Sequence, residues 1–216
     1  MKGNLIIISS PSGGGKGTLI KRVLQTLPDI GYSISYTTRA TRGGETHGKD
    51  YFFVSRNEFQ TLIENGALLE YAEVHDNFYG TSIEQVNLQI EAGRDVILEI
   101  DVQGAESVLD RVPEAVSIFI MPPSYAILAA RLTARATETA DVLALRLQNS
   151  FGEVSRYAEF KYVVINDEVE KATQDLQTII LAERLRRDRQ ASRIQSILSS
   201  FDKSKKSKNH AFGEQI

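Results

Sequence analysis

The stretch IIISSPSGGGKGTLI, residues 6–20, constrains this chain more than any other feature. An apolar run enters a glycine-rich loop with a single lysine, Lys16, and an apolar segment with helical spacing follows until Pro28. A buried strand, a glycine loop and a helix are the context of phosphate-binding loops, because backbone N–H groups and the helix start surround phosphate oxygens. The segment therefore predicts a nucleotide site, with a plain glycine turn as the alternative.

Two positions depart from the usual pattern of such a loop. Ser10 stands where glycine is usual, and Gly17 stands where a serine or threonine hydroxyl often binds Mg²⁺. The neighbouring Thr18 can contact phosphate instead, with the metal held mainly through water and carboxylates. The residues expected around the phosphates are Ser10, Pro11, Ser12, Gly13, Gly14, Gly15, Lys16, Gly17 and Thr18.

Strands and helices alternate along most of the chain. Unbroken apolar runs predict strands at 4–8, 95–101, 115–120 and 161–166. Helical spacing predicts helices at 82–92, 124–134, 139–150 and 168–190. This alternation predicts an α/β fold with a parallel sheet covered on both faces. Residues 31–81 break the rhythm with short alternating strands around one helical piece, which predicts a small mixed insertion.

Two groups of charged residues are candidates for the site. Glu99 and Asp101 lie two apart at the carboxyl end of a predicted strand, where open α/β sheets bind ligands. They suit a hydrated Mg²⁺ or the amino groups of a substrate, or they form an ordinary polar strand end. The second group is basic and consists of Arg39, Arg42, Arg131, Arg135 and Arg146. Its last three members could close over a transferring phosphoryl group, whereas a solvated basic face is the alternative for any single arginine.

Composition bounds the remaining choices. The 216 residues, 42% hydrophobic and 25% charged, are typical of a soluble globular protein. The lack of cysteine excludes disulfides and thiolate metal sites and suits a reducing compartment such as the cytoplasm. No apolar run approaches the roughly 20 residues of a membrane span. His47, His75 and His210 form no metal-ligand pattern.

The charge is unevenly placed. The overall net charge of −3 does not favour nucleic acid as a partner, yet residues 183–216 carry a net +5 and the remainder −8. We expect the lysine-rich end to be disordered, with binding of nucleic acid or a partner as the alternative. Deletion of residues 190–216 is expected to leave activity intact.

Several longer segments, in order, resemble guanylate kinases. They are PSGGGKGT, SISYTTRATRGGETHGKDYFFV, LLEYAEVHDNFYGT, LEIDVQG, FIMPPS and RLTARATET, and the resemblance runs from about Gly3 to about Leu185. It implies transfer of the γ-phosphoryl group of ATP to GMP, and as a further expectation to dGMP, in purine nucleotide metabolism and GMP recycling. Mg²⁺ is the implied cofactor. The implied parts are a P-loop core at 1–34, 82–123 and 150–190, a GMP-binding insertion at 35–81, a helical lid at 124–149 and the basic tail at 191–216.

The resemblance also assigns individual residues. It implies a GMP site of Ser35, Arg39, Arg42, Tyr51, Glu70, Tyr79, Thr81 and Asp101. It implies a catalytic role for Lys16, Arg131, Arg135 and Arg146, ATP binding by the loop, and a place for Asn166 on the adenine side. In this site guanine N1–H and the N2 amino group would donate to Glu70, with Asp101 helping at N2 and Ser35 donating to O6. Water-mediated metal contacts are expected from Thr18, Glu99 and Asp101.

Two other functions stay open at this point. A scaffold-type binding module with a guanylate-kinase-like fold lacks the ATP loop, so Lys16 and the lid arginines weigh against it. A kinase of another nucleoside monophosphate or of a phosphorylated sugar would not need Glu70 with Ser35 and Asp101. No membrane partner is expected, and the oligomeric state is not predicted.

Overall fold

The computed structural model describes residues 2–74, 76–134 and 140–213. Its core is a parallel five-stranded sheet in the order β2–β7–β1–β8–β9, with bounds Ile30–Tyr32, Asp95–Glu99, Leu5–Ser9, Val116–Met121 and Tyr162–Ile165. Central β1 pairs with β7, where Leu5 faces Val96, and with β8, where Ile6 faces Val116. The predicted α/β fold with a parallel sheet is confirmed, and the carboxyl ends of its strands meet at one edge.

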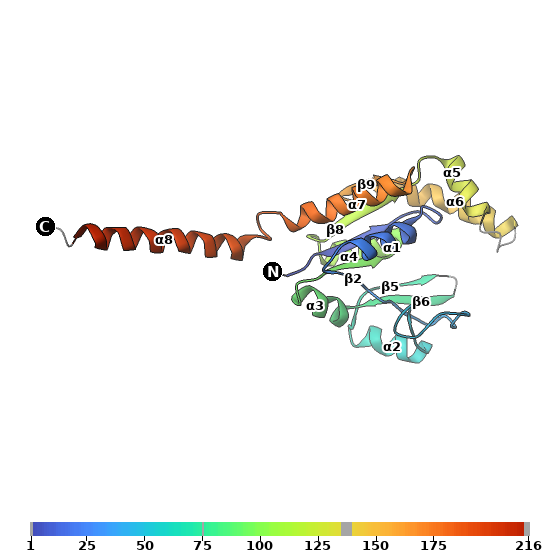
Figure 1. Cartoon of the computed structure of the whole chain (residues 1–216). Helices are drawn as coiled ribbons and strands as arrows, with labels where there is room; N and C mark the ends of the chain where they lie inside the picture. Colours follow the sequence, from blue (N-terminus) through green and yellow to red (C-terminus); the bar gives the residue numbers. More distant parts are fainter. Residues whose placement is uncertain (1, 75, 135–139, 214–216) are drawn as a thin grey trace.

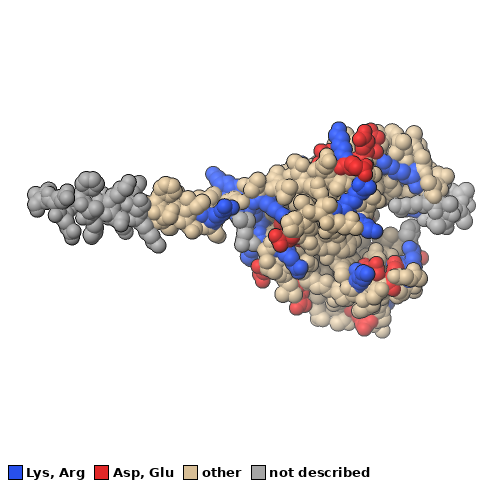
Figure 2. Space-filling view, viewed as in Figure 1, with Lys and Arg blue, Asp and Glu red and all other residues tan. Residues whose placement is uncertain are grey.

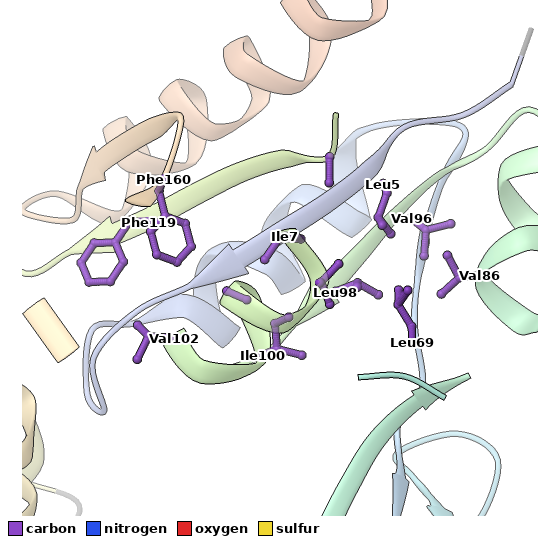
Figure 3. Close-up of a cluster of buried hydrophobic side chains, with 13 residues drawn as sticks. Leu5, Ile7, Leu69, Val86, Val96, Leu98, Ile100, Val102, Phe119 and Phe160 are labelled. Atoms are coloured by element: carbon purple, nitrogen blue, oxygen red, sulfur yellow. The ribbon is translucent and has the colours of Figure 1, made fainter. Parts of the chain in front are cut away.

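Helices cover both faces of this sheet (Figure 1). On one face α1 (Lys16–Thr26) packs against α7 (Val169–Arg184), and on the other lie α3 (Ile83–Glu91) and α4 (Val102–Arg111). Successive residues of β1 point to opposite faces, so Ile6 belongs to the cluster under α1 and Ile7 to the cluster under α4. Figure 3 shows the second cluster around Ile7, Leu98 and Phe119. Burial on both faces explains why β1 shows no alternation of apolar and polar residues.

The insertion forms a second sheet below the core. Its strand order is β4–β3–β6–β5, with bounds Phe52–Phe53, Tyr36–Thr37, Asn77–Ser82 and Leu68–Val74. Helix α2 (Arg56–Glu64) begins with a capping box in which Ser55 and Glu58 satisfy each other's backbone N–H groups. Phe59 from this helix is fully buried and stacks on Phe78 at a ring-centroid distance of 5.4 Å. This contact fixes the helix on the sheet.

A helical pair stands above the carboxyl edge of the core sheet. It consists of α5 (Tyr125–Thr133) and α6 (Ala140–Ser155), and a short 3₁₀ helix, η1 (Arg156–Glu159), leads from it to β9. Arg135, which was predicted to share a helix face with Arg131, lies outside the described residues.

Two predictions differ from the structure. The strand predicted at 95–101 ends at Glu99, because the side chain of Asp101 accepts a hydrogen bond from the N–H of Gly104 (2.8 Å) and starts α4, a helix that was not predicted. The tail predicted to be disordered contains helix α8 (Ala191–Gly213), which extends away from the core (Figure 1). It lacks proline and has glycine only at its last residue, and Ile194, Ile197 and Phe201 recur at helical spacing.

Among the described residues, no helix is both long and apolar enough to cross a membrane.

Candidate active site

A cavity of about 650 Å³ lies where the core sheet, the insertion and α6 meet. In the space-filling view the molecule is hollowed on the side away from α8, and basic and acidic side chains both border the hollow (Figure 2). The lining residues assigned by sequence are Ser12, Lys16, Ser35, Tyr51, Glu70, Tyr79, Glu99, Asp101 and Arg146. The cavity thus joins residues of four segments: the glycine loop, the insertion, the end of β7 and α6.

The glycine loop after β1 is held in shape by Asn166, the residue that follows β9. Gly15 has a φ of 92°, and a Cβ there would lie only 2.2 Å from Nδ2 of Asn166. The same amide nitrogen donates to the carbonyl of Gly14 (2.8 Å). Gly15 caps α1 without a side-chain hydrogen bond, which leaves the first N–H groups of the helix for an anionic ligand.

Lys16 lies among carboxylates at the inner end of the cavity. Its Nζ donates to the carbonyl of Ile100 (2.8 Å) at the carboxyl edge of the sheet. Burial lowers the pKa of Lys16 below its usual value, and the nearby carboxylates of Glu99, Asp101 and Glu153 oppose this shift. The ammonium group of Lys16 can pair with a phosphate in this pocket. A cation shared by the carboxylates would offset their negative charge.

Glu70 is a buried carboxylate at the insertion side of the cavity. Its side chain accepts a hydrogen bond from the hydroxyl of Thr81 (2.7 Å), and the residue is only 6% exposed. A Cβ on Gly104 would lie 3.1 Å from Glu70 Oε2 and 3.3 Å from Asp101 Oδ1, so the two carboxylates converge over that glycine. Burial raises the pKa of Glu70 to about 7, helped by Asp101 and opposed by the Thr81 hydroxyl. Such a group binds best to a ligand that presents N–H donors.

An aromatic and basic corner lies beside Glu70. The ring of Tyr51 is 6.0 Å from the ring of Tyr79, and the guanidinium of Arg39 lies 5.3 Å from the centre of the Tyr51 ring. Arg39 does not line the cavity, because it pairs with Glu45 (2.7 Å). Glu45 also accepts from the backbone N–H of Arg42 (2.8 Å), whose side chain is exposed. One carboxylate therefore holds the turn that carries both arginines.

The arginines of the helical pair contact the glycine loop and Asn166, the residue that supports the loop. Arg131 Nη2 donates to the backbone carbonyl of Asn166 (2.9 Å), and Arg146 Nη2 is hydrogen-bonded to the hydroxyl of Ser12. Glu153, also on α6, accepts from the backbone N–H of Ser12 (3.0 Å). Within the described part of the chain, Arg131 Nη1 and Asn166 Oδ1 are buried and have no hydrogen-bond partner. Both atoms lie beside the loop and are suited to a polar ligand.

The predicted site residues do not all reach the cavity. Thr81 acts through Glu70, and Arg131 and Asn166 lie behind the glycine loop. The predicted residues outside the cavity lining are Arg39, Arg42, Thr81, Arg131, Asn166, Ser10, Pro11, Gly13, Gly14, Gly15, Gly17 and Thr18.

Sequence reasoning missed three residues that shape the site. Glu45 forms an ion pair with Arg39, and Glu153 accepts a hydrogen bond from the backbone of the glycine loop. The hydroxyl of Tyr32 donates to Glu99 Oε2 (3.1 Å). Only Glu45 carried a signal, because an acid stands three residues after Arg42 in a glycine turn. The other two depend on contacts between distant segments.

Within the part of the chain that the structure describes, no cluster of three or more histidine, aspartate or glutamate side chains could hold a metal ion by itself. Mg²⁺ commonly uses one or two carboxylates, several waters and substrate phosphates. Glu99 and Asp101 at the sheet edge fit that mode of binding.

Comparisons with known proteins agree on one family. The family model described as guanylate kinase matches residues 2–183. A guanylate kinase from Neisseria gonorrhoeae is 50% identical over 199 residues, 92% of this chain and 97% of the relative. One from Salmonella typhi is 47% identical over 202 residues, 93% and 98% of the two chains. The crystal structure of guanylate kinase from Anaplasma phagocytophilum is similar with a TM-score of 0.72 at 36% identity, covering 87% of this chain and 89% of that one.

Proposed function

This chain belongs to the guanylate kinase family and is an ATP:GMP phosphotransferase, and on that premise we propose how its residues divide the work. The observation that carries the proposal is that one cavity contains both Lys16, from the glycine loop, and the buried carboxylate of Glu70. The first suits a transferring phosphoryl group and the second a purine edge with N–H donors. GMP would occupy the insertion side and ATP the loop side.

Glu70 and Asp101 would read guanine. Guanine presents N1–H and the N2 amino group side by side, and two converging carboxylates can accept both. Ser35 also lines the cavity and would donate to O6. Adenine has an acceptor at N1 and would leave Glu70 without a donor, a mismatch that can discriminate by about 10⁴-fold.

The corner of Arg39, Tyr51 and Tyr79 would hold the GMP phosphate. Tyr51 and Tyr79 line the cavity, and Arg39 lies against the Tyr51 ring. Arg39 has to exchange its contact with Glu45 for the phosphate, and Arg42, now exposed, would join it. Forked arginine contacts suit a phosphate dianion.

The glycine loop, Lys16 and the arginines Arg131, Arg135 and Arg146 would bind ATP and stabilise charge on the moving phosphoryl group. The unpartnered Asn166 Oδ1 supports a place for the adenine amino group beside the loop. No general base is required, because a phosphate monoester with a second pKa near 6 is already largely dianionic at neutral pH. The residues instead bring two anions into line.

Mg²⁺ bound with ATP would neutralise phosphate charge during transfer. Glu99 and Asp101 would hold it through water, with Thr18 nearby at the start of α1. We further propose that dGMP is a second substrate, and that the chain serves GMP recycling in purine metabolism in the cytoplasm.

The test is a coupled assay of ADP release with ATP, Mg²⁺ and each of GMP, dGMP, AMP, CMP and UMP. Turnover with GMP, and to a lesser degree dGMP, with little from the others supports both halves of the proposal. A folded protein that turns over none of them would contradict it, and turnover with AMP equal to that with GMP would contradict the guanine assignment.

Affinity for guanosine should rise with pH. The pKa of Glu70 is raised to about 7 by burial, so the carboxylate that accepts guanine donors is only about one-tenth ionised at pH 6 and about nine-tenths at pH 8. The expected result is an about tenfold lower Kd for guanosine at pH 8, measured by calorimetry. Guanosine is used because it lacks the phosphate that titrates near pH 6. The matched Glu70→Gln variant should bind guanosine weakly and without this pH dependence; an identical slope in the variant would contradict the assignment.

Removal of α8 should leave catalysis intact. Truncation after Gln190 keeps the bond from Arg189 to the carbonyl of Gly3 (3.1 Å) and the bond from Gln190 to the carbonyl of Arg184 (3.1 Å). We expect kcat and KM for GMP within about twofold of the full chain. A tenfold loss of kcat in a folded truncated protein would show that the tail takes part in the reaction.

A further inference from the structure

Tyr32 is the last residue of β2 and has no part in the roles assigned above. Its side chain reaches into the cavity, and its hydroxyl donates to Oε2 of Glu99 (3.1 Å). A phenol loses its proton only well above neutral pH. The hydroxyl therefore keeps its proton and stays a hydrogen-bond donor.

Glu99 in turn faces the start of α1. A Cβ on Gly17 would lie 3.5 Å from Glu99 Oε1 and 3.9 Å from Oε2. Gly17 occupies the position at which other phosphate-binding loops place a metal-binding hydroxyl. The carboxylate thus lies opposite the place where that hydroxyl would otherwise be, beside Lys16.

We propose that Tyr32 is a positioning residue that holds the carboxylate of Glu99 toward Gly17, so that Glu99 binds water on Mg²⁺ where the loop lacks a hydroxyl. With Oε2 tied to Tyr32, Oε1 stays directed at the start of α1. Without the hydroxyl, Glu99 can turn toward the ammonium of Lys16, since that cation lies close enough for the two charges to interact. This role rests on the proposed function, in which Mg²⁺ accompanies ATP.

The alternative is that the hydroxyl only stabilises the edge of the sheet. The chain offers a matched control for this, because Tyr162 on the opposite edge strand, β9, donates to Glu183 Oε1 (2.5 Å). Tyr162→Phe removes the same kind of pair at a residue outside the cavity lining. Both variants remove one tyrosine–glutamate hydrogen bond at an edge strand, and only the bond of Tyr32 lies at the cavity.

The experiment measures Mn²⁺ binding to the ADP complex of the full chain by electron paramagnetic resonance, together with ADP affinity without metal. Tyr32→Phe should weaken Mn²⁺ binding by roughly tenfold, as loss of a residue behind a metal-binding group does, with unchanged metal-free ADP affinity. Tyr162→Phe should bind Mn²⁺ like the wild type. Adding Gly17→Ser to Tyr32→Phe should restore most of the lost Mn²⁺ affinity, because serine supplies the metal-binding hydroxyl that the loop lacks. Serine fits at position 17, since a Cβ there would meet Glu99 only at ordinary contact distance.

Wild-type Mn²⁺ affinity in Tyr32→Phe would overturn the positioning role, as would equal losses in both tyrosine variants. If Tyr32→Phe does not fold, Glu99→Gln tests the same carboxylate, and wild-type Mn²⁺ affinity there would overturn the role too. GMP turnover by the wild type is a separate measurement, so a failure of the proposed function is distinguishable from a failure of this inference.

Discussion

Replacement of Lys16 with methionine is expected to lower kcat by about a thousandfold or more while the protein stays folded. Lys16 supplies a positive charge at the carboxyl edge of the sheet, where its Nζ donates to the carbonyl of Ile100. Methionine has a similar length and no charge. Loss of the charge removes an interaction that matters most when the phosphoryl group is being transferred, because negative charge then develops beside Lys16.

The matched control is Lys21→Met, an exposed lysine on the same helix. It should leave kcat unchanged within about twofold. Circular dichroism and thermal unfolding of both variants separate loss of catalysis from loss of structure. A Lys16→Met enzyme with kcat within tenfold of the wild type would show that phosphoryl transfer does not depend on this charge.

Glu70→Gln should change which nucleotide the enzyme accepts. The amide places an NH₂ group where guanine presents its own donors, so kcat/KM for GMP should fall by about 10²-fold. The same amide can donate to N1 of adenine. The ratio of kcat/KM for GMP to kcat/KM for AMP should therefore fall by a larger factor than kcat/KM for GMP itself.

The stability of this variant gives an independent readout. The pKa of Glu70 is about 7 in the folded state and 4.5 in the unfolded state. Between pH 4.5 and pH 7 the folded state therefore binds a proton that the unfolded state has lost. Stability from this group is thus present at low pH and is lost as pH rises through that window. At pH 8 glutamine removes the buried charge, and Tm should rise by a few degrees.

Glu64→Gln, an exposed change at the end of α2 in the same insertion, serves as control and should alter neither the nucleotide preference nor Tm. An unaltered GMP/AMP preference in Glu70→Gln would mean that the base is read elsewhere in the cavity.

The core was predictable because its signals are local. Each of these elements is recognised from a few neighbouring residues: an unbroken apolar run, a glycine-rich loop, and helical spacing that ends at a proline. These patterns predicted β1, the glycine loop and α1. Helix α4 was missed although Val102, Ala105 and Val108 recur at helical spacing. Its N-cap, Asp101, ends an apolar run and was assigned to the strand.

The parts of the site that were not predicted depend on contacts between distant segments. Arg146 reaches Ser12 across a sequence separation of 134 residues, and Tyr32 reaches Glu99 only because β2 pairs with β7. The resemblance supplied residue roles but no partners, so the pairing of Arg39 with Glu45 was not expected. The lysine-rich composition of the tail likewise concealed the helical spacing of Ile194, Ile197 and Phe201.

The support of Gly14 by Asn166 has a consequence for biosynthesis. The glycine loop is among the first segments to leave the ribosome, yet the residue that shapes it follows 152 positions later. At about 5–20 residues per second, a nascent chain carries this loop for roughly ten seconds or more without its support. The neighbouring strand β1 lacks both of its partner strands for much of that time, with its apolar residues exposed. A nascent chain therefore cannot capture ATP in a finished loop until synthesis has passed β9, and during that interval the unpaired β1 is open to aggregation.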